Sequence, residues 1–501
     1  MSGKKLFRSG LLLLLLEVFF GALAWSVQPG EAVPEKSCLG IEILSEVDMA
    51  RFQEYQYHDY SEELKYQGDY APVDQETSVL YLSGKIPETD SALSLPGQLT
   101  LDHPGTQLYF APDAYWDSLA QAVRNGHRFK LLILNSEKTY MQYDVIFTTL
   151  PVISLYGELL YKDTEMRNVL SGRIRMWDPV EEEPLSGRVH WHVRGKSAGG
   201  QDKKPWKLSL KDRDGKNNNE DLLGLGSDDD WILNAMNMED SNVREKLFME
   251  LWNEVAEESG HNYPMSRGEY VEVLVNGEYS GLYLLQRRID GQYLELSQKD
   301  VLIKGQYNGI EPFYEVLHAG SADLTLLDSL FYENDVRYLS VHNFIDVSLF
   351  LQLFCAVDNQ GYKNMYYALN GQEEGGVISL IPWDTDMAFG IEWDAKTDGF
   401  IYRYKKYLDL NVRRKEIKSM EVCYPELHRM MSARWQELRQ GVFRQEYIYE
   451  KMDVWLEMLA CSGADVRDWE KWGLYYEGDD TIENLYRFVE ERLAVLDDYY
   501  S

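Results

Sequence analysis

The sequence predicts an α+β protein in which a sheet-rich region is followed by a helix-rich region, with a small mainly β module in front of both. Three observations predict this class. Residues 41–149 hold short alternating apolar runs separated by Pro and Gly turns, and residues 150–288 hold further strand-like runs. After about residue 320 the apolar residues recur at helical spacing. The chain of 501 residues is long enough for roughly two to four domains.

Residues 1–25 are typical of a signal peptide or a membrane anchor. Basic residues precede an apolar run from Leu11 to Trp25, and Ala22-Leu23-Ala24 offers a small-residue cleavage site. Because the run is short for a membrane-spanning helix of ~20 residues, we favour an exported protein with a cleaved signal over a retained anchor. Residues 26–40 contain Pro and Gly among polar residues, which predicts a linker.

Local patterns predict several elements after the linker. Residues 41–149 form the mainly β module, with one helix near 113–124. Residues 241–258 have helical spacing, and Ser241 is well placed as the N-cap. Two β runs flank Asn276-Gly277, which is the strongest hairpin signal in the chain, and residues 364–382 resemble a second hairpin.

The charge balance excludes some functions. The chain carries 50 Lys and Arg against 83 Asp and Glu, a net charge of −33. Such a field repels phosphate backbones, so we expect no nucleic-acid partner, and any anionic ligand requires a local basic pocket. The four cysteines form no C-x-x-C pair and no H-E-x-x-H is present, so a zinc site based on Cys or His has no support.

One basic loop joins two predicted strands near residue 195. Gly195 to Gly199 matches the G-x-S-x-G motif of hydrolases, but that motif needs a helix directly after Ser197, and a second strand is predicted instead. A Gly- and Ser-rich loop with several cations can also surround a polyphosphate. The alternative is a solvated turn flanked by surface lysines. The residues in question are Arg194, Lys196, Ser197, Lys203, Lys204 and Lys207.

Acidic residues follow a predicted strand further along the chain. Asp384 and Asp386 come after the apolar run 377–381, and on an extended segment their carboxylates would share one face, as two ligands of Mg²⁺ would. Asp358 and Asn364 could supply a catalytic base and a further metal ligand. The alternative is that these residues are helix caps and turn formers, where Asp and Asn are common.

Together these ordered motifs resemble the spore-coat-protein-H (CotH) kinase family over about residues 150–500. The resemblance implies an atypical two-lobed domain like that of protein kinases, with an N-lobe over about 150–288 and a C-lobe over about 289–500. It rests on residues 193–197, 203–210, 231–236, 270–285 and 382–390, together with Asp240, Arg244, Asp358 and Asn364.

The resemblance assigns roles to particular residues. Asp358 becomes the catalytic aspartate, Asp384 the main Mg²⁺ ligand, and Asp386 and Asn364 its supporting ligands. The lysine that binds the nucleotide falls among Lys203, Lys204 and Lys207, with Lys204 or Lys207 favoured. Arg194 and Ser197 would line the phosphate loop, and Leu284-Leu285-Gln286 would be the hinge that contacts adenine. Glu245, Glu250 and Glu254 are the candidate partners of the lysine.

The implied function is an exported or membrane-tethered kinase at the cell surface. It would transfer phosphate from ATP, with Mg²⁺, to Ser or Thr of a surface or spore-coat protein. The alternative is a non-catalytic structural protein of the spore coat or cell envelope, which binds partners through its N-terminal β module.

Overall fold

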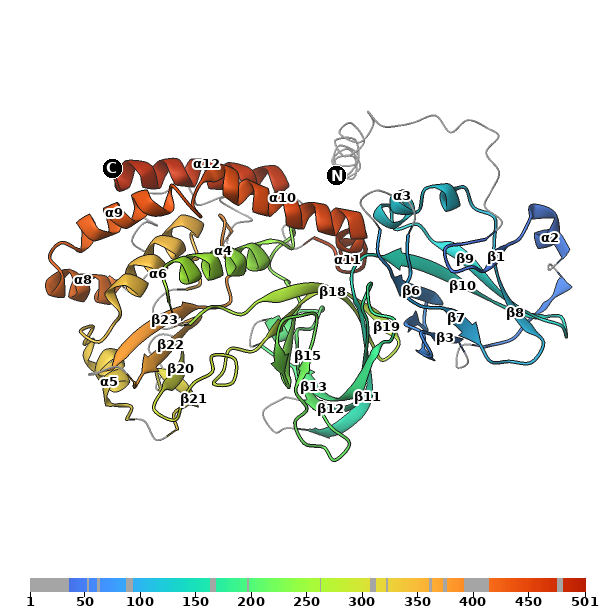
Figure 1. The fold of residues 1–501 in the computed structure, drawn as a ribbon, viewed down its shortest axis with the longest axis horizontal. Coiled ribbons are helices and arrows are strands. Elements are labelled where there is room, and N and C mark those ends of the chain that lie inside the picture. Colours follow the sequence, from blue (N-terminus) through green and yellow to red (C-terminus); the bar gives the residue numbers. More distant parts are fainter. Residues whose placement is uncertain are drawn as a thin grey trace, which may run out of the picture.

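The computed structural model describes residues 36–501 apart from residues 52–53, 61–63, 87–92, 163–167, 196–197, 262, 307–311, 321–322, 360–362, 373–375, 392–413 and 475–480. In Figure 1 an N-terminal sheet lies at one end, a β-barrel in the middle and a helix-rich region at the other end. The mixed α+β class and the mainly β N-terminal region are therefore confirmed.

The N-terminal region is built on a seven-stranded sheet. The strand order is β1-β8-β9-β10-β6-β5, and β2 pairs with β10. The strands are β1 (Glu42–Ile43), β2 (Gln56–Tyr57), β5 (Val73–Asp74), β6 (Val79–Ser83), β8 (Thr106–Phe110), β9 (Phe129–Asn135) and β10 (Thr139–Thr148). A small sheet adds β3 (Leu64–Tyr66), β4 (Asp69–Tyr70) and β7 (Leu99–Leu101), and the helices are α2 (Glu46–Arg51), a 3₁₀ turn (Ala114–Asp117) and α3 (Leu119–Arg124). The last two elements correspond to the helix predicted near 113–124.

The middle of the molecule is a closed barrel in the order β11-β12-β13-β14-β17-β19-β18. Its strands are β11 (Val152–Lys162), β12 (Asn168–Trp177), β13 (Leu185–Val193), β14 (Trp206–Lys211), β17 (Asp230–Asn234), β18 (Gly268–Val275) and β19 (Glu278–Arg287), with β15 (Glu220–Asp221) and β16 (Ser227–Asp228) beside them. Alternate side chains such as Trp191, Leu208 and Leu285 fill the interior. Parallel pairing of β11 with β18 closes the ring.

The predicted hairpin at Asn276-Gly277 is confirmed and joins β18 to β19. Both turn residues have positive φ, +51° and +77°, which Asn and Gly adopt more readily than other residues. A β-bulge between Val273 and Leu274 shifts the register of this hairpin, and beyond it Leu285 lies inside the barrel and Leu284 in the core of the helical region.

The helix-rich region surrounds a second, four-stranded sheet. Its order is β21-β20-β22-β23, formed by β20 (Val301–Gly305), β21 (Tyr314–His318), β22 (Met365–Asn370) and β23 (Val377–Pro382). The hairpin predicted over 364–382 is thus confirmed as β22 and β23. The helices are α4 (Arg244–Glu258), α5 (Thr325–Asp328), a π-helical turn (Ser329–Glu333), α6 (Val341–Phe354), α8 (Arg414–Cys423), α9 (Leu427–Leu438), α10 (Gln445–Ser462), α11 (Ala464–Trp472) and α12 (Ile482–Tyr499). Among the residues that the structure describes, no helix is both long and apolar enough to span a bilayer, and the predicted anchor at 1–25 lies outside them.

Helix α4 starts differently from the prediction. Ser241 is not its N-cap, because the helix begins at Arg244 and the preceding Val243 makes no side-chain cap. Glu239 takes this role, since its Oε2 accepts a hydrogen bond from the Arg244 N–H at 2.6 Å and its Oε1 accepts one from the Glu245 N–H at 3.4 Å. A carboxylate at a helix N-terminus is favoured by the helix dipole.

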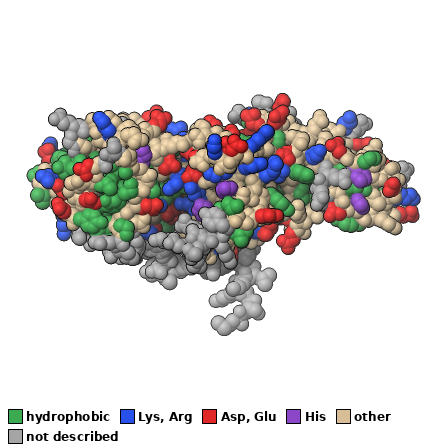
Figure 2. All heavy atoms as spheres, turned by 90° about the horizontal axis from the view of Figure 1, so that it is seen from below, with side chains coloured by type: hydrophobic (Ala, Val, Ile, Leu, Met, Phe, Trp, Pro, Cys, Tyr) green, Lys and Arg blue, Asp and Glu red, His purple; other side chains and the backbone are tan. Residues whose placement is uncertain are grey.

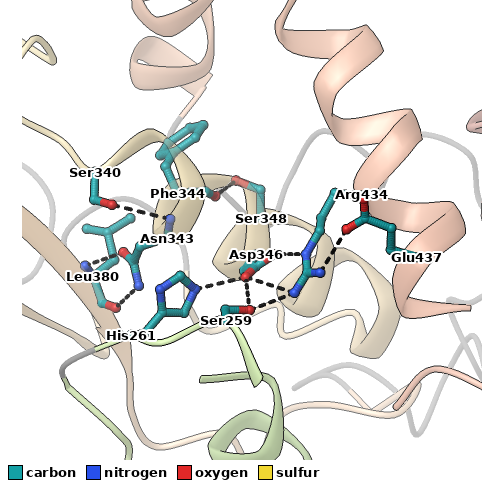
Figure 3. A network of polar contacts seen from close by, with 10 residues as sticks. All are labelled: Ser259, His261, Ser340, Asn343, Phe344, Asp346, Ser348, Leu380, Arg434 and Glu437. Carbon is teal, nitrogen blue, oxygen red and sulfur yellow. Dashed lines mark hydrogen bonds and ion pairs between the residues drawn. The ribbon is translucent and has the colours of Figure 1, made fainter. Parts of the chain in front are cut away.

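One buried carboxylate ties three helices together (Figure 3). Asp346 of α6 accepts hydrogen bonds from Ser259, just after α4, at 2.8 Å and from Arg434 of α9 at 2.7 Å, and His261 Nε2 lies 2.8 Å from it. Burial alone would raise the pKa of Asp346, but the hydrogen bonds from His261 and Arg434 outweigh it and lower that pKa. The Ser259 hydroxyl donates to Asp346 and not to His261, so this Ser, His and Asp set fixes helix packing and is not a nucleophilic triad.

Helix α11 and the N-terminal sheet both pack against the barrel. Arg467 of α11 forms a buried ion pair with Glu272 of β18 at 2.8 Å. From the other side, Tyr81 of β6 stacks on Tyr279 of β19 with ring centroids 4.6 Å apart, and Asp74 accepts the Tyr279 N–H at 3.0 Å. The N-terminal sheet is therefore packed directly on the barrel.

Candidate functional site

The loop between α6 and β22 presents Asp358 in a fixed orientation. Its Oδ2 accepts a hydrogen bond from Asn364 Nδ2 at 2.8 Å, and its Oδ1 pairs with Lys363 Nζ at 2.5 Å. Burial raises the pKa of Asp358, the Lys363 ammonium opposes this, and the charge of Asp384 adds to the rise. Asp358 is 9% exposed, so it is almost enclosed but still reaches solvent.

Asn359 connects this loop to the loop after β23. Its Nδ2 donates to the carbonyl oxygens of Asn364 at 2.9 Å and of Trp383 at 2.8 Å. Asn364 Nδ2 also lies 3.4 Å from the carbonyl oxygen of Asp384. The structure therefore brings Asp358, Asn364 and Asp384 into one hydrogen-bonded unit. Asn359 carries no sequence signal of its own, since it is one more polar residue in the loop.

The backbone at Asp384 differs from the extended segment that we predicted. Strand β23 ends at Pro382, and Asp384 has φ +58°. Asn364 has φ +55°, so two non-glycine residues adopt the left-handed conformation within the same unit. Asn and Asp tolerate this conformation better than other non-glycine residues, and such backbone is concentrated at functional sites. Asp384 and Asp386 therefore do not share one face of a strand.

Glu245 of α4 reaches this acidic loop. Its Oε2 accepts hydrogen bonds from the Thr385 N–H at 2.8 Å and from the Thr385 hydroxyl at 2.9 Å. Its Oε1 is buried and has no hydrogen-bond partner in the described part of the chain. Burial, followed by the charge of Asp384, raises the pKa of Glu245 to about 8. The other two candidate glutamates, Glu250 and Glu254, both pair with Lys451 at 2.8 Å.

Asp386 lies in the same crowded environment. Burial raises its pKa well above the usual value, and the charges of Asp384 and Glu245 raise it further. Its Oδ1 accepts a hydrogen bond from the Met387 N–H at 2.8 Å. Acidic side chains from three segments of the chain thus repel one another here, which a bound cation would relieve.

The three candidate lysines make other contacts. Lys203 lies 2.8 Å from Asp468 Oδ1 of α11, in a pair that is 5% and 8% exposed. Lys204 donates to the backbone carbonyl oxygens of Gly199, at 3.2 Å, and of Gln201. Lys207 pairs with Asp230 at 2.7 Å. Within the described residues, none of these contacts joins a lysine to Asp358, Asp384 or Asp386.

Two other cations lie close to Asp384. The Arg194 guanidinium stands 5.7 Å from the Trp383 ring centre, and Lys304 Nζ of β20 stands 5.5 Å from Tyr366 and 5.9 Å from Trp383. Burial lowers the pKa of Lys304, and the charge of Asp384 opposes this. Lys304 was missed, although a lone lysine in the apolar run Val301-Leu-Ile-Lys-Gly305 was a detectable signal. Figure 2 shows Lys and Arg side chains gathered midway along one face of this otherwise acidic molecule.

Residues 191–496 match the protein family described as CotH kinase protein. The chain belongs to the CotH kinase protein family. The match covers more than half of the chain and contains every residue to which the resemblance assigned a role, so that resemblance is confirmed. No curated protein sequence matches the chain.

Two further predicted residues of this CotH-family chain are Ser197 and Gln286. Ser197 lies outside the described residues, and from Ala198 the chain forms a 3₁₀ turn and then β14, so the α-helix that a hydrolase elbow needs is not there. Gln286 of β19 is fully buried, and neither its side-chain oxygen nor its nitrogen has a hydrogen-bond partner among the described residues. It points away from the barrel interior, on the same side as Leu284.

Among the described residues, no three His, Cys, Asp or Glu side chains form a group that could hold a metal ion. Mg²⁺ bound with a nucleotide needs only one or two carboxylates, because phosphate oxygens and waters complete its shell. The Glu245 oxygen without a hydrogen-bond partner and the neighbouring carboxylates of Asp384 and Asp386 are oxygen ligands of the kind that Mg²⁺ takes, so the residues present fit such a cation.

Two cavities lie away from this unit. A cavity of about 1890 Å³ lies between the N-terminal sheet, the barrel and α10. None of the predicted site residues is among the described residues that line it. A smaller cavity of about 290 Å³ is lined by Lys203, Glu239 and Asp468. The chemistry of Asp358 and Asp384 decides where the site is, since cavity size alone carries no chemical information.

Proposed function

We propose that this CotH-family chain is an atypical kinase that is exported or membrane-tethered. In this proposal it transfers phosphate from ATP, with Mg²⁺, to a Ser or Thr hydroxyl of a surface or spore-coat protein. The barrel acts as the N-lobe of a two-lobed kinase-like domain and the helix-rich region as the C-lobe. The observation that supports the proposal best is the hydrogen-bonded unit of Asp358, Asn364 and Asp384.

Asp358 acts on the acceptor hydroxyl in this proposal. The hydroxyl oxygen forms a bond to the γ-phosphorus as the bond from that phosphorus to the bridging oxygen breaks, so ADP leaves and the hydroxyl proton passes to Asp358. Asn364 Nδ2 holds one carboxylate oxygen at 2.8 Å, and Lys363 opposes the effect of burial on the carboxylate pKa. Both contacts orient Asp358 and favour its ionised form, which a base requires.

The metal would be held by Asp384, with Asp386 and Asn364 in support. When bound, Mg²⁺ supplies positive charge that stabilises the phosphoryl oxygens during transfer. Glu245 fixes the loop that carries these ligands through its two hydrogen bonds with Thr385. The acidic surroundings thus become useful, because they concentrate a cation that the overall charge of the chain also attracts.

A non-catalytic structural protein of the spore coat or envelope is the second candidate. Two observations favour it: Lys363 already occupies one oxygen of Asp358, and the favoured lysines Lys204 and Lys207 are engaged elsewhere. In that case the fold is retained and MgATP has no effect on it.

Incorporation of phosphate from radiolabelled ATP distinguishes the two candidates. We expect Mg²⁺-dependent autophosphorylation or labelling of a coat-protein extract by the wild type, and a loss of at least about 100-fold in Asp358→Asn and in Asp384→Asn. Glu426→Gln is the control, because Glu426 is an exposed carboxylate at the start of α9 whose ion pair within the described part of the chain is with the exposed Arg429. Equal labelling by the wild type and both site variants, or none by any of them, would favour the structural protein.

A further inference from the structure

We propose that Lys304 of β20 and Arg194, which directly follows β13, bind the triphosphate, and that no lysine of the segment 203–207 does so. We call these two side chains, together with the Trp383 ring that they share, the cation cradle. This inference rests on the proposed function, since it names the groups that hold the phosphates of the same nucleotide.

The lysines of the segment 203–207 have structural partners that they cannot leave without cost. Lys203 neutralises Asp468 inside a pair that is almost fully buried, and its departure would leave a carboxylate without a counter-ion. Lys204 closes the turn of its own loop by binding two carbonyl oxygens. Lys207 shares Asp230 with Arg288, at 2.7 Å and 3.3 Å.

The cradle cations have no such partner. Among the described residues, no ion pair within 4.0 Å joins Lys304 or Arg194 to a carboxylate, and each of the two cations sits over the Trp383 ring. An aromatic face attracts a cation, but it supplies far less than a full negative charge. Two cations held near one another with one shared aromatic ring form a site for an anion with more than one charge.

The position of the cradle suits the γ and β phosphates. Trp383 is directly followed by Asp384, the proposed metal ligand, so phosphates between Lys304 and Arg194 would lie beside the metal. Arg194 follows β13 of the barrel, whereas Lys304 belongs to β20 of the helix-rich region. A triphosphate held by both would therefore connect the two lobes.

The test measures binding and not catalysis. Isothermal titration with inorganic tripolyphosphate, and separately with MgATP, is carried out on the full chain as wild type, Lys304→Met and Arg194→Met. We expect each variant to bind at least about tenfold more weakly, which corresponds to the loss of one charge-assisted contact. Two controls should bind both ligands within about twofold of the wild type. One is Lys207→Met, and the other is Lys299→Met, which changes an exposed lysine just before β20, the strand that carries Lys304.

Several results would overturn the cradle. These are wild-type affinity in Lys304→Met, loss of binding in Lys207→Met, or no binding of either ligand by the wild type at millimolar concentration. Lys304→Arg keeps the charge and should retain binding if Lys304→Met proves unstable. If the wild type transfers phosphate and Lys304→Met binds MgATP as tightly as the wild type, the cradle is refuted and the kinase proposal stands. If MgATP binding depends on Lys304 and Arg194 but the wild type transfers no phosphate, the kinase proposal is refuted and the cradle stands.

Discussion

The buried pair of Lys203 and Asp468 makes a sharp prediction about stability. It joins the loop before β14 to α11, and Asp468 also accepts the Leu282 N–H of β19 at 2.9 Å. We predict that Lys203→Met lowers the free energy of unfolding by about 3–5 kcal/mol, the usual cost of removing one partner from a buried ion pair. We expect a similar loss in Asp468→Asn, since it leaves the Lys203 ammonium buried and unpaired.

The magnitude follows from the geometry. At the Nζ–Oδ1 separation of 2.8 Å, the attraction is about 6 kcal/mol with an effective dielectric constant of about 20, and desolvation offsets part of it. Burial lowers the pKa of Lys203 and raises the pKa of Asp468, and each partner opposes the effect on the other. The double variant Lys203→Met/Asp468→Asn keeps an oxygen for the Leu282 N–H and should recover about 2–3 kcal/mol relative to the sum of the single changes.

The assay is urea unfolding followed by circular dichroism and tryptophan fluorescence together, because a chain of this size can unfold in more than one step. The matched control is Lys471→Met in the same helix, which removes a more exposed contact: Lys471 pairs with Glu278 of β19 at 2.7 Å and donates to the Tyr279 carbonyl oxygen. We expect the control to cost less than about 1 kcal/mol. Losses below about 1 kcal/mol in both Lys203→Met and Asp468→Asn would refute the structural role that we give this lysine.

Three further predictions concern pH, packing and ligand binding. The pKa of Asp346 is lowered in the folded chain, so the stability that this carboxylate contributes is present above its usual pKa of 3.8 and is lost as the pH falls through the folded pKa. Asp346→Asn should therefore make the thermal unfolding midpoint less sensitive to acid. A midpoint with the same pH dependence as that of the wild type would contradict this. Gly281 has φ +106°, and a Cβ there would lie 2.2 Å from Asp468 Oδ1, so Gly281→Ala should lower the free energy of unfolding by about 1–3 kcal/mol, whereas the same change at the open Gly215 turn should cost less. MgATP at about 100 times its Kd should stabilise the wild type by about 2.7 kcal/mol and Asp384→Asn by much less, and equal shifts of the unfolding midpoint would place the nucleotide elsewhere.

The elements that could be predicted are those that neighbouring residues determine. The Asn276-Gly277 turn specifies its own hairpin, and Asp358, Lys363 and Asn364 lie within one short loop. The family motifs singled out this loop and the segment around Asp384, and the structure brings the two together through Asn359.

The features that could not be predicted depend on partners far apart in the chain. Lys203 meets Asp468 across 265 positions, and Glu245 meets Thr385 across 140. Periodicity predicts that a residue lies on a strand or helix, but it does not predict which distant charge neutralises it. For this reason the basic segment 194–207 looked like one phosphate site, whereas the structure gives Lys203, Lys204 and Lys207 separate partners and places Lys304 of another sheet near Trp383.

The most direct test of the central claim is the position of a bound metal. Crystals grown with Mn²⁺ and a non-hydrolysable ATP analogue would locate the metal by its anomalous scattering. The account predicts a peak about 2 Å from a carboxylate oxygen of Asp384, with the γ-phosphate between that metal and Asp358. A metal and nucleotide bound away from Asp384, with Asp358 and Asn364 untouched, would contradict it.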